Sequence, residues 1–192
     1  MEFIKLKSNK GEIIDGLIQI IPDVYNDERG YFLESWNNNK LNKFLGREIK
    51  FTQDNISKSK KNVIRGLHYQ IKPNPQAKLI RCLAGSIFDV AVDIRINSKT
   101  FGQWAGIKLS EKNKFQFLIP EGFAHGFLSL ENNSIIYYKI TNKWVKELER
   151  AIVWNDKEID ILWPLPDKDF ILSQKDENAF SFSEAIKLND IF

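Results

Sequence analysis

The middle of the sequence constrains the fold most strongly, because short runs of alternating apolar and polar residues follow one another about every ten residues. β-Branched and aromatic residues dominate these runs, and Gly or Asn clusters separate them. The expected strands cover residues 78–83, 87–95, 104–109, 115–119, 123–130 and 134–141. Closely spaced antiparallel strands are typical of a sandwich or a barrel. The sequence therefore predicts a mostly β protein, with one domain over residues 1–192.

Turn and capping signals extend this prediction. We expect a hairpin of residues 78–83 and 87–95 around Gly85, and a turn at residues 131–133 between the last two strands. Helix is scarce: residues 37–45 form one expected segment, and residues 183–191 form another with Ser183 as its N-cap. We expect the rest of the C-terminal stretch to wrap the β-core as a loop.

Composition excludes several classes of protein. The single cysteine, Cys82, allows neither an internal disulfide nor a zinc site built from several cysteines, and it fits a reducing compartment. There is no apolar run of about 18 residues and no signal-peptide pattern at the N-terminus. We therefore expect a cytoplasmic protein without a membrane partner.

The charge distribution points to a small anionic ligand rather than to nucleic acid. The net charge of +3 is too low to indicate nucleic-acid binding by itself. However, the stretch from Lys40 to Arg81 holds 11 basic residues and only two acids, Glu48 and Asp54. This excess would suit a phosphorylated ligand, and the alternative is an ordinary solvated face.

The two histidines stand in unusual settings. In a regular strand Arg65 and His68 would face opposite ways, so both can line one pocket only if Gly66 hosts a β-bulge. His125 lies between Gly122 and Gly126, which permit close approach of the backbone. Either histidine could instead be a hydrogen-bonded structural residue. With two histidines 57 positions apart and no His-x-His pair, a metal site is not expected.

Six blocks of sequence resemble a known family. They are residues 27–35 (DERGYFLES), 53–55 (QDN), 65–70 (RGLHYQ), 88–95 (FDVAVDIR), 119–127 (IPEGFAHGF) and 154–156 (WND). In this order they resemble the dTDP-4-dehydrorhamnose 3,5-epimerase family over about residues 20–178. The resemblance implies a cupin-type double-stranded β-helix (jelly roll) with short peripheral helices, and a homodimer. It also implies epimerisation of a nucleotide-linked 4-keto-6-deoxy sugar without a metal or cofactor.

The chemistry of such a reaction makes definite demands. A ketone at C4 acidifies the protons on C3 and C5, because either carbanion delocalises onto the C4 oxygen as an enolate. Epimerisation needs a base on one face, an acid on the other and a cation near the oxyanion. By the resemblance His68 is the base and Asp176 fixes its tautomer. Tyr138 is then the proton donor and Lys78 the cation, although an alignment slip of one residue would put Tyr137 in place of Tyr138.

The resemblance also implies the residues that bind a nucleotide-diphosphate sugar. They are Arg29, Glu34, Gln53, Asn55, Arg65, His125, Glu149 and Lys175. The two arginines suit a diphosphate, because a guanidinium group grips phosphate oxygens with two parallel hydrogen bonds. Asp89 matches another acid of the family, and its contact could be His125, Lys78 or the scaffold alone.

Departures from the family pattern leave the substrate open. Lys143-Trp144 stands where the family commonly has two aromatic residues, and Trp144 could still stack on a base. We expect C3 and C5 epimerisation of dTDP-4-dehydro-6-deoxy-D-glucose to dTDP-4-dehydro-L-rhamnose. The alternatives are an epimerase acting at C3 or C5 only or on another nucleotide-linked 4-keto hexose or heptose, a sugar-binding jelly roll without turnover, and a metal-dependent oxygenase.

Overall fold

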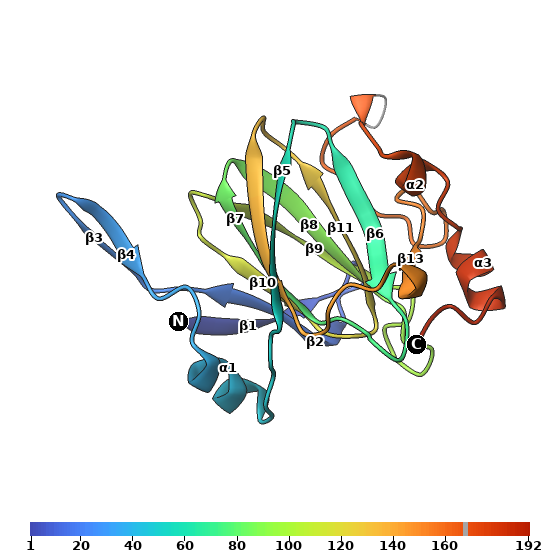
Figure 1. Ribbon diagram of the computed structural model, residues 1–192, viewed down its shortest axis with the longest axis horizontal. Helices are drawn as coiled ribbons and strands as arrows, with labels where there is room; N and C mark the ends of the chain where they lie inside the picture. The colour runs from blue at the N-terminus through green and yellow to red at the C-terminus, as the bar shows by residue number, and fades with distance from the viewer. Residues whose placement is uncertain (167–168) are drawn as a thin grey trace.

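The computed structural model describes residues 1–166 and 169–192, and its strands form two antiparallel sheets that face each other (Figure 1). The first sheet has the spatial order β1 (Glu2–Lys7), β2 (Ile13–Ile21), β10 (Gln116–Ile119), β7 (Lys78–Ala84), β12 (Ser134–Ile140) and β5 (Gln53–Ser59). The second has the order β13 (Glu149–Ala151), β6 (Ile64–Gln70), β11 (Phe123–Ser129), β8 (Ser86–Asp93) and β9 (Trp104–Ser110). The smaller elements are the hairpin strands β3 (Val24–Asp27) and β4 (Gly30–Leu33), the helices α1 (Asn38–Leu45), α2 (Gln174–Glu177) and α3 (Phe182–Lys187), and the 3-10 turn η1 (Lys146–Leu148).

The predicted fold class, all six predicted strands and the turn at residues 131–133 are confirmed, but the predicted hairpin of residues 78–83 with 87–95 is wrong. β7 and β8 lie in different sheets, and so do β11 and β12. Alternating apolar residues mark a strand that has an inner face, but the same pattern arises whichever sheet the strand joins. At the turn between β7 and β8 the chain crosses between the sheets, and Gly85 lies so close to Ser134 that an added Cβ would come within 2.7 Å of its Oγ.

Both faces of the second sheet are buried. Ile87 and Ala91 of β8 point into the core between the sheets, where they meet Phe117 of β10. The opposite face of β8, with Val90 and Val92, packs against a second cluster that the C-terminal segment supplies. This segment contributes Ile152, Ile159, Ile161, Phe182 and Ala185. The prediction that the C-terminal stretch wraps the β-core is therefore confirmed.

The first predicted helix is confirmed, and the start of the second is wrong. Asn37 caps α1 by accepting a hydrogen bond from the Lys40 N–H, and Gly46 ends the helix in the left-handed conformation. The N-cap of α3 is Ser181 rather than Ser183. Glu184 stands three residues after Ser181 and completes a capping box, which residue 183 lacks the spacing to form.

The β3–β4 hairpin projects away from both sheets (Figure 1). It carries large apolar side chains in water: Tyr25 is 63% exposed, Tyr31 57% and Phe32 70%. An exposed group of this kind is typical of a surface that contacts another molecule. Separately, no helix among the described residues is long and apolar enough to cross a membrane.

Candidate active site

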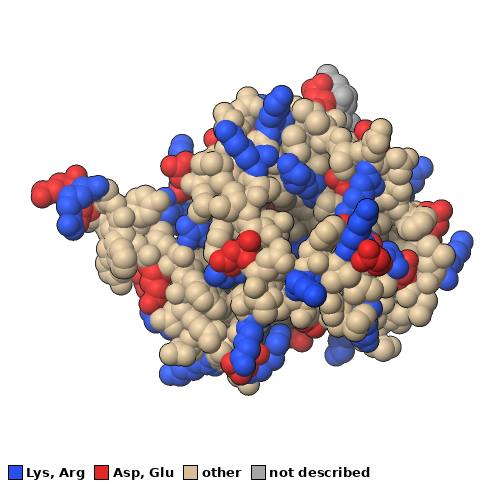
Figure 2. Space-filling model, in the orientation of Figure 1, with Lys and Arg blue, Asp and Glu red and all other residues tan. Residues whose placement is uncertain are grey.

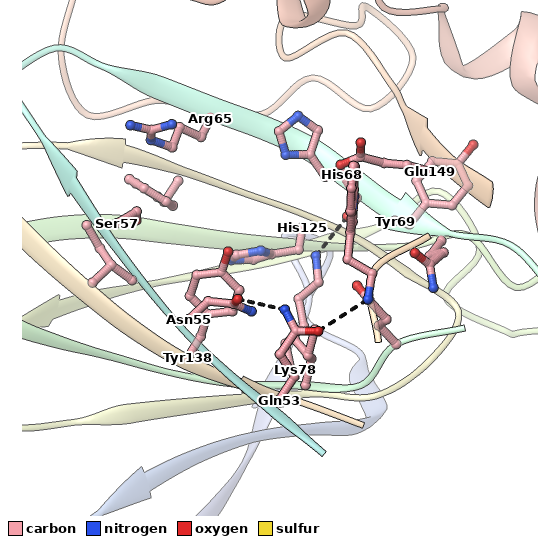
Figure 3. Close-up of a pocket in the computed structure, with 16 residues that line it drawn as sticks. Gln53, Asn55, Ser57, Arg65, His68, Tyr69, Lys78, His125, Tyr138 and Glu149 are labelled. Atoms are coloured by element: carbon pink, nitrogen blue, oxygen red, sulfur yellow. Dashed lines mark hydrogen bonds between the residues drawn. The ribbon is translucent and has the colours of Figure 1, made fainter. Parts of the chain in front are cut away.

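A cavity of about 430 Å³ opens between the two sheets (Figure 3). One wall comes from β5, β7 and β12 of the first sheet, and the other from β6, β11 and β13 of the second. The lining residues are Gln53, Asn55, Ser57, Arg65, His68, Tyr69, Gln70, Gln76, Lys78, His125, Phe127, Ile136, Tyr138, Ile140, Trp144 and Glu149. This volume lies in the range of small-molecule sites.

A β-bulge at Gly66 brings two predicted site residues to the same cavity. His68 pairs with His125 of β11, whereas Arg65 pairs with Phe127, so β6 holds one more residue than β11 over this stretch. Gly66 has a φ of 136°, and a Cβ on it would overlap the Cα of Gly126. The bulge that the sequence predicted is therefore present, and Arg65 and His68 both line the cavity.

His68 and Asp176 form a hydrogen-bonded pair across 108 residues. His68 Nε2 lies 2.5 Å from Asp176 Oδ1, and the acid is buried at the start of the chain's second helix. Burial by itself raises the pKa of Asp176, but the hydrogen bond from His68 and its charge hold that pKa below its usual value. An ionised carboxylate can only accept, so the proton of this hydrogen bond is on His68 Nε2, and in the neutral ring the lone pair is then on Nδ1. The imidazole is thus in the tautomer that a base requires.

Tyr138 reaches the same cavity from the opposite sheet. It lies on β12 and is partly buried, and burial raises the pKa of its phenol although nearby Arg65 opposes the shift. Its neighbour Tyr137 points to the outer face, where its hydroxyl donates to Asp54 Oδ2 at 2.8 Å. The predicted register of these two tyrosines on the strand is therefore confirmed, and the cavity has an imidazole on one wall and a protonated phenol on the other.

Two of the polar side chains that line the cavity, those of Lys78 and His125, are buried. Burial lowers the pKa of Lys78 to about 8, and the Asp89 carboxylate offsets this only in part. The Lys78 Nζ donates to the backbone oxygen of His68 at 3.1 Å. His125 Nε2 lies 2.7 Å from Asp89 Oδ1, and burial lowers the pKa of His125 despite that carboxylate. The contact of Asp89 that the sequence left open is thus His125.

The predicted binding residues divide into three groups. Gln53, Asn55, Arg65, His125 and Glu149 line the cavity. Lys175 does not line the cavity itself, but its Nζ lies 2.7 Å from Oε2 of Glu149, which does.

Arg29 and Glu34 do not line the cavity. Arg29 is bound to Asp27 near the tip of the β3–β4 hairpin, and Glu34 is bound to Lys40 and Asn37. Their role in binding, which the resemblance implies, therefore stays a prediction.

Sequence reasoning missed Ser57 and Gln70. The Ser57 Oγ is buried and has no hydrogen-bond partner within residues 1–166 and 169–192. Extending the alternation of Gln53 and Asn55 along β5 by two residues would have found it. The same alternation would have predicted Gln70, because it stands two residues after His68 and therefore on the same face of the strand.

The basic excess predicted from Lys40 to Arg81 is distributed rather than concentrated. Figure 2 shows basic side chains over this face of the molecule with acidic ones between them. Within the cavity the basic side chains are Arg65 and Lys78, in addition to the two histidines. Among the described residues, no group of three or more His, Cys, Asp and Glu side chains could hold a metal ion. That the chemistry needs neither metal nor cofactor stays a prediction.

Comparison with known proteins gives a consistent result. A profile of the family described as dTDP-4-dehydrorhamnose 3,5-epimerase matches residues 12–184. An enzyme of that name from Shigella flexneri is 51% identical over 176 residues, which cover 92% of this chain and 96% of the relative.

Solved structures agree. A dTDP-6-deoxy-D-glucose-3,5-epimerase from Legionella pneumophila, in complex with dTDP-4-keto-L-rhamnose, superposes with a TM-score of 0.89 at 43% identity and covers 99% of this chain and 97% of its own. ChmJ, a 3'-monoepimerase from Streptomyces bikiniensis in complex with dTDP-quinovose, has a TM-score of 0.87 at 30% identity and covers 93% of this chain and 89% of its own.

Proposed function

This chain belongs to the dTDP-4-dehydrorhamnose 3,5-epimerase family, and we propose that it inverts C3 and C5 of dTDP-4-dehydro-6-deoxy-D-glucose to give dTDP-4-dehydro-L-rhamnose. The observation that carries this proposal is the position of His68 and Tyr138, which line one cavity from two opposing sheets. A hexose ring between them would meet a base on one face and an acid on the other. Inversion at a carbon requires that arrangement, because the proton leaves one face and another proton arrives on the opposite face.

The first step is proton removal by His68. Its Nδ1 takes the proton from C3 or C5, and the electron pair of the broken C–H bond delocalises onto the C4 oxygen as an enolate. Asp176 stabilises the imidazolium that forms, because its ionised carboxylate lies 2.5 Å from Nε2. General base catalysis of this kind typically contributes about 10²–10⁴-fold to the rate.

The enolate needs a cation and then a proton. Lys78 is buried beside His68, so its ammonium acts on the enolate oxygen in surroundings where water screens little. Tyr138 then donates its proton to the carbanion carbon from the other face. Burial raises the pKa of Tyr138, which keeps this acid protonated at neutral pH.

The polar side chains of the cavity hold the nucleotide diphosphate. Arg65 reaches the cavity from the bulge and binds phosphate oxygens, while Gln53 and Asn55 offer amide groups from β5. His125 and Glu149 complete the polar lining, and Lys175 is paired with Glu149 behind it. Trp144, which is 51% exposed at the cavity, provides a flat surface for the base.

A homodimer is part of this proposal. Arg29 lies in the turn of the β3–β4 hairpin, which exposes Tyr31 and Phe32, and Glu34 directly follows this hairpin, so both lie away from the cavity of their own protomer. We propose that this hairpin packs against a second copy and brings both polar residues to the partner's cavity. If so, Phe32→Asp yields monomers in sedimentation and Arg29→Ala weakens substrate binding while the dimer persists.

Turnover in heavy water tests the proposed reaction. The wild type should incorporate deuterium at both C3 and C5 of dTDP-4-dehydro-6-deoxy-D-glucose, as followed by NMR. In His68→Asn the exchange rates at C3 and C5 should both fall about 10²–10⁴-fold, while the melting temperature stays near that of the wild type. Equal exchange in His68→Asn would refute the assignment of the base, and no exchange in the wild type would favour a sugar-binding module.

The similarity to ChmJ gives a second candidate function. That relative is a 3'-monoepimerase at 30% identity and shares this fold. Deuterium at C3 alone, with C5 remaining protonated after prolonged incubation, would replace the double epimerisation by this reaction.

A further inference from the structure

The segment that follows β12, residues 142–145, has no regular secondary structure and nevertheless carries Trp144 at the mouth of the cavity. Its backbone groups are held by side-chain amides from other parts of the chain. Gln76 Nε2 donates to the Asn142 oxygen at 2.9 Å, and Gln53 Oε1 accepts from the Trp144 N–H at 3.4 Å. The Val145 oxygen accepts from the Leu148 N–H at 3.1 Å, and two further contacts come from Gln70.

Gln70 holds this segment from both sides of Trp144. Its Nε2 donates to the Lys143 oxygen at 3.2 Å, and its Oε1 accepts from the Val145 N–H at 2.7 Å. The same Nε2 also donates to the backbone oxygen of Asn74. Gln70 is 2% exposed, so water cannot replace these hydrogen bonds when they are lost.

The position of Gln70 connects the two ends of the site. It lies on β6 two residues after His68, and residues two apart on a strand share a face. One strand therefore carries the base of the reaction and the amide that holds the segment with Trp144. A side-chain amide supplies both the donor and the acceptor that these contacts require.

We propose that Gln70 is a positioning residue for the nucleotide: it fixes Trp144 as a rigid platform for the base at a set distance from His68. This inference rests on the proposed function, because it takes a nucleoside diphosphate as the ligand. A platform that is fixed before binding loses little conformational freedom when the base stacks on it. Substitution of Gln70 should therefore weaken nucleotide binding and spare the chemical step.

The test uses dTDP as the probe, with titration calorimetry for its Kd and turnover of the dTDP-sugar for kcat. Gln70→Met keeps the size of the side chain and removes every hydrogen bond. It should raise the Kd for dTDP about tenfold and leave kcat at saturating substrate within about twofold, since stacking on an aromatic side chain typically contributes about 5- to 150-fold per base. Gln70→Glu at pH 8, which keeps the acceptor for Val145 N–H, gives a second variant should Gln70→Met unfold.

A double-mutant cycle separates positioning from a general loss of packing. Trp144→Ala should weaken dTDP binding by itself, and Gln70→Met should add nothing to it, because the platform is already absent. Gln103→Met is the matched control: Gln103 is also buried and makes two side-chain hydrogen bonds, but to Ser8 and Glu12 outside the cavity. It should leave the Kd for dTDP unchanged.

The outcomes are distinct. If Gln70→Met and Gln70→Glu bind dTDP like the wild type, or if their losses multiply with that of Trp144→Ala, the positioning role is refuted. A fall in kcat with an unchanged Kd also refutes it, because Gln70 would then act on His68. If the wild type itself binds no dTDP, the proposed function fails, and this inference fails with it.

Discussion

The alkaline limb of the pH–rate profile is a sensitive test of the role of Lys78. Burial lowers its pKa from 10.5 to about 8. From this value, the charged fraction falls from about 0.9 at pH 7 to about 0.1 at pH 9. Loss of one electrostatic donor to a developing oxyanion typically costs about 10²–10³ in kcat, so the neutral amine contributes almost nothing. We therefore expect kcat/KM to fall about tenfold between pH 7 and pH 9.

The assay is the initial rate of deuterium incorporation into the dTDP-sugar from pH 6 to pH 10. Tyr138 offers the competing explanation for an alkaline limb, but burial raises the pKa of its phenol above the usual value, so a limb due to the phenol would lie at a clearly higher pH than one due to Lys78. Tyr138→Phe should therefore keep the fall near pH 8 in its residual exchange, whereas Lys78→Met should lose it. A profile that stays flat to pH 9.5 in the wild type, or a limb near pH 8 that persists in Lys78→Met, would refute the reasoning.

Three further predictions concern the surroundings of Lys78 and the bulge. Folding depresses the pKa of Lys78 from 10.5 to about 8, so between these pH values the unfolded chain binds more protons and stability rises with pH. Lys78→Met removes the penalty and should stabilise the fold at pH 7 by up to about 3 kcal/mol in urea unfolding; a lower midpoint would contradict this. Because the Asp89 carboxylate raises the pKa of Lys78, Asp89→Asn should move the alkaline limb below pH 8, and an unchanged limb would mean that the two charges do not interact. Gly126→Ala places a Cβ 2.8 Å from the Arg65 oxygen and 2.9 Å from Leu67 Cδ2. It should therefore cost about 1–3 kcal/mol of stability in a denaturant titration and lower kcat. Wild-type stability and wild-type kcat in this variant would contradict the close packing of the two strands.

The strands could be predicted from sequence, but their partners could not. Period-two alternation located β7, β8, β11 and β12 to within two residues. It could not tell that the turn at Gly85 crosses from one sheet to the other, because local alternation is the same for a hairpin and for a crossing between facing sheets. Pairing depends on contacts between residues far apart in sequence, and one sequence alone does not contain them.

Local geometry was predictable where a single residue type decides it. Gly66 is an example: the need to turn Arg65 and His68 to one side required a bulge, and glycine is the residue that permits it. The N-cap of α3 shows the limit, since Ser181 and Ser183 are equally good caps by type. Only the glutamate three residues after Ser181 distinguishes them.

The site was foreseen largely through the family resemblance rather than from spacing. No local pattern links His68 to Asp176, which is 108 residues away on a helix of four residues. Arg29 and Glu34 fit the family pattern but do not line the cavity. The role of Gln70 depends on hydrogen bonds to a segment more than 70 residues later, so sequence spacing does not reveal it.

The stereochemistry of exchange in Tyr138→Phe tests the two-sided mechanism most directly. Without the phenol, the imidazolium of His68 can exchange its proton with solvent and return a deuteron to the face from which the proton left. We predict that Tyr138→Phe incorporates deuterium into the dTDP-sugar with the starting configuration retained, while Tyr137→Phe, which alters the outward-facing neighbour, yields inverted product like the wild type. Inverted product from Tyr138→Phe at the wild-type rate would contradict the account, because the second proton would then come from another group.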